Sequence, residues 1–255
     1  MPKYIENKFI NKFKKRDFFS REELFNFFLL YEPDLKESTL AWRIYDLKKK
    51  NIIKSVRRGY YTISSKPHFE PLLSTELIKF SKSFIEKYQD VKYCVWETDW
   101  LNEFLQHQTS KRILIIEIEK EFVESLYFLL KDTFENDLYF NPKDKTIDFY
   151  ITESSYPIVI KNLITRSPIE SRTVNDFKVS TPFLEKILVD LFADERLYYL
   201  YNGSELINIY ENAITNYTIN FTKLFSYAKR RERKNEIKLF LTNTMGHLIK
   251  EILDD

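Results

Sequence analysis

The chain has 255 residues, of which 44% are hydrophobic and 16% aromatic, so it is long enough to bury a large core in one or two domains. Its three glycines argue against a glycine-rich phosphate loop, and its single cysteine, Cys94, excludes an intrachain disulfide and a cysteine-rich zinc site. The net charge of +2 is unevenly spread, because residues 1–66 hold 16 Lys and Arg against 8 Asp and Glu, whereas the remainder holds 24 against 30. A basic first quarter is typical of a module that contacts a polyanion, although a solvated basic face would have the same composition.

The first residues lack the uninterrupted apolar core of a secretory signal, and no run of about 18 apolar residues is present to span a bilayer. A lone cysteine fits a reducing compartment. We therefore expect a cytoplasmic protein that does not contact a membrane.

The chain begins with two predicted helices. Apolar residues recur every fourth position over residues 5–15, which predicts the first helix. The pair Phe18-Phe19 predicts a short strand, and Ser20 with Glu23 three residues later is a capping box that begins the second helix. The pair Pro33-Asp34 then predicts a turn.

The next stretch, Ser38 to Ile63, predicts a helix followed by a β-hairpin. Ser38 is the expected N-cap, and the apolar residues behind it share one helix face: Leu40, Ile44 and Leu47. After Asn51, where we expect the helix to end, two apolar strands flank the sequence Arg57-Arg58-Gly59. Gly59 supplies the positive φ that a tight hairpin turn needs.

Residues 1–66 thus have the order helix, short strand, helix, turn, helix, hairpin, which is the layout of a winged helix-turn-helix domain. In such a domain the last helix enters the major groove of DNA, and the hairpin, or wing, touches the backbone or the minor groove. We expect Trp42 and Arg43 to project from the outer helix face toward base edges, and the lysines and wing arginines to contact phosphates. The predicted DNA-binding residues are Thr39, Trp42, Arg43, Lys48, Lys49, Lys50, Lys54, Arg57, Arg58 and Tyr60. A wing that docks another protein is the alternative.

A linker is predicted where prolines and polar residues interrupt both periodicities, at Ser64, Ser65, Lys66, Pro67 and Pro71. Helices are expected over 75–88 and 122–130, with a short one capped by Thr98. Strands are expected at 93–96, 113–116, 138–140, 147–151 and 158–160. The run 113–116 lacks alternation, which predicts a strand buried on both faces.

From Pro182 onward the pattern is almost wholly helical, with helices expected over 183–192, 204–217, 221–231 and 235–253. The predicted fold class is α+β. It has an N-terminal winged helix-turn-helix over residues 1–66 and a larger C-terminal mixed α/β domain over 73–255 that ends in a helical bundle.

A metal-dependent nuclease is one alternative for the second domain. Such enzymes use two carboxylates to hold Mg²⁺ and a lysine near the nucleophilic water. Asp99 precedes the strand that ends in Glu117, Glu119 and Lys120, but Lys120 directly follows Glu119, so the spacing fails. A strand end that passes into an acidic first helical turn explains these residues better. We predict no catalytic residue, metal or cofactor.

Neither the histidines nor the cysteine predicts a reactive site. The histidines are scattered and form no metal-binding pair: His68, His107 and His247. Cys94 lies in an apolar run, which favours burial over reactivity.

The helix after Pro182 carries charged residues beside a firm apolar stripe. Glu185 and Asp190 are either exposed on the helix surface, or they pair with Arg166, Arg172 or the basic run 229–234 in a polar pocket. The basic run is either a second nucleic-acid contact or a basic helix end favoured by the helix dipole. The candidate polar site consists of Glu185, Lys186, Asp190, Arg230 and Arg231.

Taken together, the chain resembles the AbiEi-type abortive-infection antitoxins, which are the transcription-repressing partners in type IV toxin-antitoxin systems. The resemblance is carried by Arg57-Arg58-Gly59-Tyr60-Tyr61, by Val95-Trp96-Glu97-Thr98 with Leu101-Asn102, and by the segment Leu184 to Leu191. It implies a non-enzymatic repressor that binds an inverted-repeat operator on double-stranded DNA upstream of its own operon. It also implies a C-terminal domain that counteracts a cognate nucleotidyltransferase toxin without necessarily forming a stable complex with it. The oligomeric state is left open.

Overall fold

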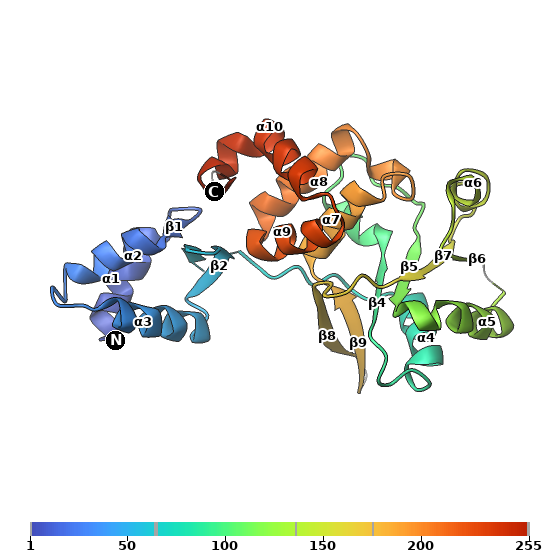
Figure 1. Cartoon of the computed structure of the whole chain (residues 1–255), viewed down its shortest axis with the longest axis horizontal. Helices are drawn as coiled ribbons and strands as arrows, with labels where there is room; N and C mark the ends of the chain where they lie inside the picture. Colours follow the sequence, from blue (N-terminus) through green and yellow to red (C-terminus); the bar gives the residue numbers. More distant parts are fainter. Residues whose placement is uncertain (1, 64–65, 136, 175, 254–255) are drawn as a thin grey trace.

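The computed structural model describes residues 2–63, 66–135, 137–174 and 176–253 (Figure 1). The fold is mixed α+β, with small sheets and a C-terminal helical stretch, as the sequence predicts. The buried apolar side chains form two clusters, one within residues 5–61 and a larger one that joins Val56 to residues 69–253. Two positions of the predicted linker, Ser64 and Ser65, lie outside the described residues.

Residues 2–63, which we call the N-terminal module, have the predicted order of elements. These are α1 (Lys3–Phe13), β1 (Phe19–Ser20), α2 (Arg21–Leu29), α3 (Glu37–Lys49), β2 (Ile53–Arg57) and β3 (Tyr60–Ile63). The strands form an antiparallel sheet in the order β1-β3-β2. Its core is rich in phenylalanine, and Phe13 and Phe19 pack with their ring centres 4.3 Å apart.

The ends of α2 and α3 follow local hydrogen bonding. Ser20 caps α2 as predicted, because the Glu23 amide donates to its hydroxyl at 3.1 Å and its own amide donates to the Glu23 carboxylate at 2.8 Å. The prediction that Ser38 caps α3 was wrong, since the helix already begins at Glu37 and is preceded by Lys36. At the other end, Asn51 has a φ of 54° and the amide of Ile52 donates to the carbonyl of Leu47 at 2.9 Å, which is a Schellman ending.

We call residues 66–253 the body. Its main sheet has the strand order β4-β5-β7-β6, in which β5 and β6 run parallel to β7 and β4 runs antiparallel to β5. The elements of this part are α4 (Thr75–Ile85), β4 (Tyr93–Glu97), β5 (Leu114–Ile118), α5 (Val123–Thr133), β6 (Leu138–Phe140) and β7 (Ile158–Asn162). Every residue of β5 is buried, which confirms the strand expected at 113–116.

Three parts of the body differ from the sequence prediction. The segment 147–151 is not a strand but a π-helical turn that follows the short helix α6 (Asp144–Thr146). Ile147 and Ile151 are buried whereas Phe149 and Tyr150 are exposed, and this spacing of four residues is helical. A hairpin of β8 (Ile169–Val174) and β9 (Phe177–Pro182) was not predicted, because its strands contain many polar residues. The helix that Thr98 was expected to cap is a 3₁₀ helix over Thr98–Glu103, and because Glu97 precedes it, Thr98 is its first residue and not its cap.

Four helices complete the body close to their predicted limits. They are α7 (Leu184–Ala193), α8 (Ser204–Asn216), α9 (Phe221–Arg230) and α10 (Lys234–Leu253). Figure 1 shows them between the N-terminal module and the main sheet, with the end of α10 close to β1 and β2. None of the helices in the described segments is long and apolar enough to cross a membrane.

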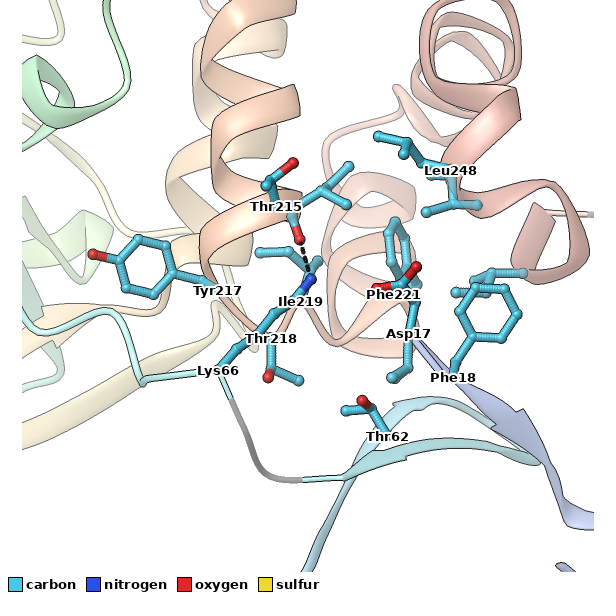
Figure 2. Close-up of a pocket in the computed structure, with 14 residues that line it drawn as sticks. Asp17, Phe18, Thr62, Lys66, Thr215, Tyr217, Thr218, Ile219, Phe221 and Leu248 are labelled. Atoms are coloured by element: carbon cyan, nitrogen blue, oxygen red, sulfur yellow. Dashed lines mark hydrogen bonds between the residues drawn. The ribbon is translucent and has the colours of Figure 1, made fainter. Parts of the chain in front are cut away.

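The hairpin of the N-terminal module packs against the C-terminal helices. The Arg58 amide donates to the hydroxyl of Thr222 at 3.0 Å, and the Arg57 guanidinium donates to the carbonyl of Ile252. The seam between the two parts contains a mostly apolar pocket of about 220 Å³ (Figure 2). Phe18 lines it from the module and Phe221 from α9. The hairpin is therefore packed against the rest of the chain.

We expect Ser20→Ala to lower the free energy of unfolding by about 1 kcal/mol, because it removes the side-chain acceptor that caps α2. Ser38→Ala is the matched control. It changes an exposed serine inside the first turn of α3, so we expect a change below about 0.5 kcal/mol. Urea denaturation followed by circular dichroism measures both values. Equal losses in the two variants would contradict this assignment of the caps.

Candidate nucleic-acid interface

The outer face of α3 presents two large aromatic side chains to solvent. Trp42 is 73% exposed and Tyr45 is 58% exposed, and their rings meet edge to face with centres 5.9 Å apart. Thr39 and Lys49 are exposed on the same helix. Tyr45 is not among the predicted residues, although its spacing of three residues from Trp42 places both on one face.

Arg43 does not project from this face, so that prediction was wrong. Its guanidinium forms an ion pair with Glu32 and lies 5.1 Å from the centre of the Phe28 ring, and only 15% of its side chain is exposed. One residue along a helix is a rotation of 100°, which turns Arg43 from the outer face toward α2. Arg43 therefore holds α3 against α2 and is not placed to read bases.

The basic end of α3 has two exposed lysines before its C-cap, Lys48 and Lys49. The Lys48 ammonium lies 5.0 Å from the centre of the Tyr61 ring. Partial burial lowers the pKa of Lys48. Both residues remain at the surface, where an anion can reach them.

The next two predicted phosphate contacts have partners within the chain. The Lys50 ammonium forms ion pairs with Asp46 at 2.9 Å and with Glu6 of α1 at 3.2 Å. The Lys54 ammonium donates to the carbonyl of Lys66 at 2.9 Å. Both lysines thus contribute to local structure.

The hairpin tip has one tethered and one exposed arginine. Arg57 bonds to Ile252, whereas the Arg58 side chain is exposed and Gly59 between the strands has a φ of 82°, as predicted. Tyr60 is half-buried against Phe18, with ring centres 6.2 Å apart. The exposed members of the predicted set are therefore Thr39, Trp42, Lys48, Lys49, Lys50 and Arg58, and of these Lys50 is paired with Asp46 and Glu6.

The second predicted site is a buried ionic network. The Lys186 ammonium lies 2.8 Å from Glu117 on β5 and 2.5 Å from Asp190 one turn along α7. Asp190 also accepts a hydrogen bond from the Tyr227 hydroxyl at 2.8 Å and lies 3.7 Å from Arg231. The side chains of Lys186 and Asp190 are fully buried. Of the two alternatives for Asp190, exposure on the helix surface was wrong, whereas pairing with the basic run is confirmed by its contact with Arg231.

The network continues toward the surface through Asp194. Its carboxylate binds Arg231 at 2.5 Å and also pairs with Lys161 of β7. Burial opposes ionisation of Asp194, but these two cations hold its pKa below the usual value. Likewise, burial disfavours a charged Lys186, but Asp190 and Glu117 raise its pKa well above the usual value. Three cations and three anions thus compensate one another in and beside the core.

The other members of the predicted polar site lie outside this network. Glu185 is buried but accepts from the Asn220 amide at 2.8 Å, so it too was wrongly expected at the surface. Arg230 is exposed. Arg172 donates to the carbonyl of Pro71 at 2.8 Å, so it does not pair with α7.

The residues considered for a nuclease are not gathered in an open site. Glu117 is bound to Lys186 with only 2% of its side chain exposed, whereas Lys120 is exposed. Within the described segments no group of three or more His, Cys, Asp and Glu residues is placed to hold a metal. Cys94 is buried as predicted, and burial raises the pKa of its thiol.

We expect Lys186→Met to lower the free energy of unfolding by about 3–5 kcal/mol at pH 7, because it leaves Glu117 and Asp190 buried without their cation. Lys178→Met changes an exposed lysine of β9 and is the control, with an expected change below about 0.5 kcal/mol. Denaturation curves of both variants measure these values.

The Lys186→Met variant should also respond to pH. Burial already raises the pKa of Glu117, and loss of the ammonium raises it further. The folded variant then binds a proton that the unfolded chain, with a glutamate pKa of about 4.3, does not bind. Its stability relative to the wild type should therefore increase as pH falls from 7 to 5. A pH-independent loss below about 1 kcal/mol would contradict a compensating role for Lys186.

Comparison with known proteins identifies the chain at the level of a family. No curated protein and no solved structure matches it. A family model, described as a family of unknown function (DUF6577), matches residues 39–247, which include most of α3, the hairpin, the main sheet and most of α10. The chain therefore belongs to the DUF6577 family.

Proposed function

We propose that the chain is a DNA-binding transcriptional regulator of the antitoxin type. The observation that carries the proposal is the exposed face of α3, where Trp42, Tyr45 and Lys49 lie together on a helix that is followed by a basic hairpin.

Exposure of two neighbouring aromatic rings favours a binding surface. Tryptophan and tyrosine are frequent anchors of interfaces, and here both lie on one face of a single helix. On α3 they are accompanied by Thr39 and Lys49, which can bond to bases or phosphates. The partner that suits both features is double-stranded DNA.

The arrangement of the module supports the same partner. Residues 1–66 carry twice as many basic as acidic residues, and their order of elements is that of a winged helix-turn-helix. In that interpretation α3 enters the major groove and the exposed Arg58 contacts a phosphate. The proposal places the protein in the cytoplasm, bound to an operator of inverted repeats.

Tryptophan fluorescence tests this contact at one residue. Trp96 is fully buried and Trp100 is 6% exposed, so acrylamide should quench mainly Trp42. We expect a duplex from upstream of the gene to shield Trp42 from acrylamide, and the shielding should be absent in Trp42→Phe. Binding should also weaken steeply with salt, because phosphate contacts release counterions.

Unchanged quenching at saturating DNA would contradict a DNA-contacting α3. Shielding by a protein partner but not by any duplex would favour the alternative, in which the module docks a protein.

The antitoxin part of the proposal is supported by the resemblance of Arg57–Tyr61, Val95–Thr98 and Leu184–Leu191 to the AbiEi-type antitoxins. In this chain Thr98 accepts a hydrogen bond from the Ile113 amide at 2.9 Å, and Lys186 lies in the buried network. The quoted residues of the body thus hold the core together. A nuclease is not proposed, because Glu117, its best-placed carboxylate, is paired with Lys186.

Co-expression tests the antitoxin activity separately from DNA binding. A nucleotidyltransferase encoded beside this gene should stop growth when induced alone, and co-expression of this chain should restore growth. Trp42→Ala should retain the rescue but lose repression of the operon promoter, because it alters only the exposed face of α3. Failure of the wild-type chain to rescue growth would contradict the antitoxin activity while leaving DNA binding intact.

A further inference from the structure

We propose that the phosphate-binding surface continues from the hairpin onto α9 and α10, so that one duplex contacts both the N-terminal module and the body. The inference rests on the proposed DNA binding and adds a second contact region. It assigns a function to the basic residues at the junction of α9 and α10.

Two adjoining hollows form this surface, which we call the basic groove. Their volumes are about 410 and 390 Å³, and they share Arg57, Arg58, Thr222 and Ser226, so they are continuous. The module contributes the cations Lys48, Arg57 and Arg58. The body contributes Lys223, Lys229, Lys234 and Lys238.

The charge of the groove is a local concentration. The whole chain has 40 Lys and Arg against 38 Asp and Glu, yet the described lining of the groove holds seven Lys and Arg and no acidic residue. Arg58, Lys229 and Lys234 are exposed. A hollow with charges of one sign on its walls raises the local potential and attracts a polyanion.

The neutral polar groups of the groove suit phosphate oxygens. Thr222 and Ser226 present hydroxyls, and Asn235 presents an amide. Such side chains, together with lysine and arginine, make most protein contacts to the DNA backbone. The groove thus contains donors of several kinds.

The groove is continuous with the proposed recognition helix, which favours DNA over an acidic protein as the occupant. Lys48 belongs to α3 and also lines the groove, so the two surfaces meet at the end of α3. The bond from Arg58 to Thr222 and that from Arg57 to Ile252 hold the walls of the groove together. A duplex on α3 therefore finds further cations along its backbone.

The test compares the full-length Lys229→Ala/Lys234→Ala double variant with the wild type. Lys131→Ala/Lys145→Ala is the control, because these exposed lysines lie on α5 and α6, at the opposite end of the molecule from the hairpin (Figure 1). Affinity is measured for the upstream duplex and for a duplex of unrelated sequence, each at several salt concentrations. Shielding of Trp42 from acrylamide is recorded in the same titrations.

We expect the groove variant to bind both duplexes about tenfold or more weakly at 0.1 M salt. The slope of log Kd against log salt should fall by about 1.8, because two phosphate contacts are lost. The control should match the wild type, and saturating DNA should still shield Trp42 in the groove variant.

The inference is overturned if the groove variant binds DNA with the affinity and the salt slope of the wild type while Trp42 is still shielded. The proposed function would then still stand. Polyglutamate is titrated in parallel as an acidic polypeptide. If the wild type binds polyglutamate and the groove variant loses that binding but keeps its affinity for both duplexes, the inference is also overturned, because the groove would then take an acidic protein. If the wild type binds neither duplex, the proposed function itself fails, and the inference fails with it.

Discussion

The arrangement of the body depends on the charge of Lys186. Its ammonium is buried between Glu117 on the sheet and Asp190 on its own helix, so the sheet and α7 must meet where both carboxylates can reach it. Asp190 in turn binds Tyr227 and lies near Arg231, which places α9 against α7. The helix that carries Thr222 and Lys229 is therefore positioned by a network in the core, although its own basic residues are at the surface.

The position of α9 also determines what the hairpin can do. Because the Arg58 backbone bonds to Thr222 and the Arg57 side chain bonds to Ile252, the tip is anchored to the C-terminal helices. Val56 contributes to the larger core, which adds apolar contacts to this anchor. In the proposed DNA complex the hairpin thus connects α3 to the basic groove. The exposed Arg58 is its phosphate contact, whereas Arg57 anchors the tip through its bond to Ile252.

The sequence predicts most helices and strands, but fewer of the side-chain positions in the two candidate sites. The predicted helix limits lie close to the observed ones where the sequence has a cap or a regular apolar period, as at Ser20 and in the run from Leu184 to Leu191. Ile147 to Ile151 was misread because two buried isoleucines four residues apart also fit a short strand. Arg43 shows why the orientation of a single side chain is harder to predict. It is turned inward by Glu32 and Phe28, which come from the preceding turn and helix. The network around Lys186 likewise joins residues far apart in the chain, and no local pattern indicates their pairing.

Hydrogen-deuterium exchange of the full-length chain with and without a duplex tests the central claim most directly, because it follows every part of the proposed surface in one experiment. The account predicts slower exchange in α3, at the hairpin tip around Arg58, and at the junction of α9 and α10, with α5 and α6 unchanged. No change in α3 at a DNA concentration that saturates binding would contradict the account.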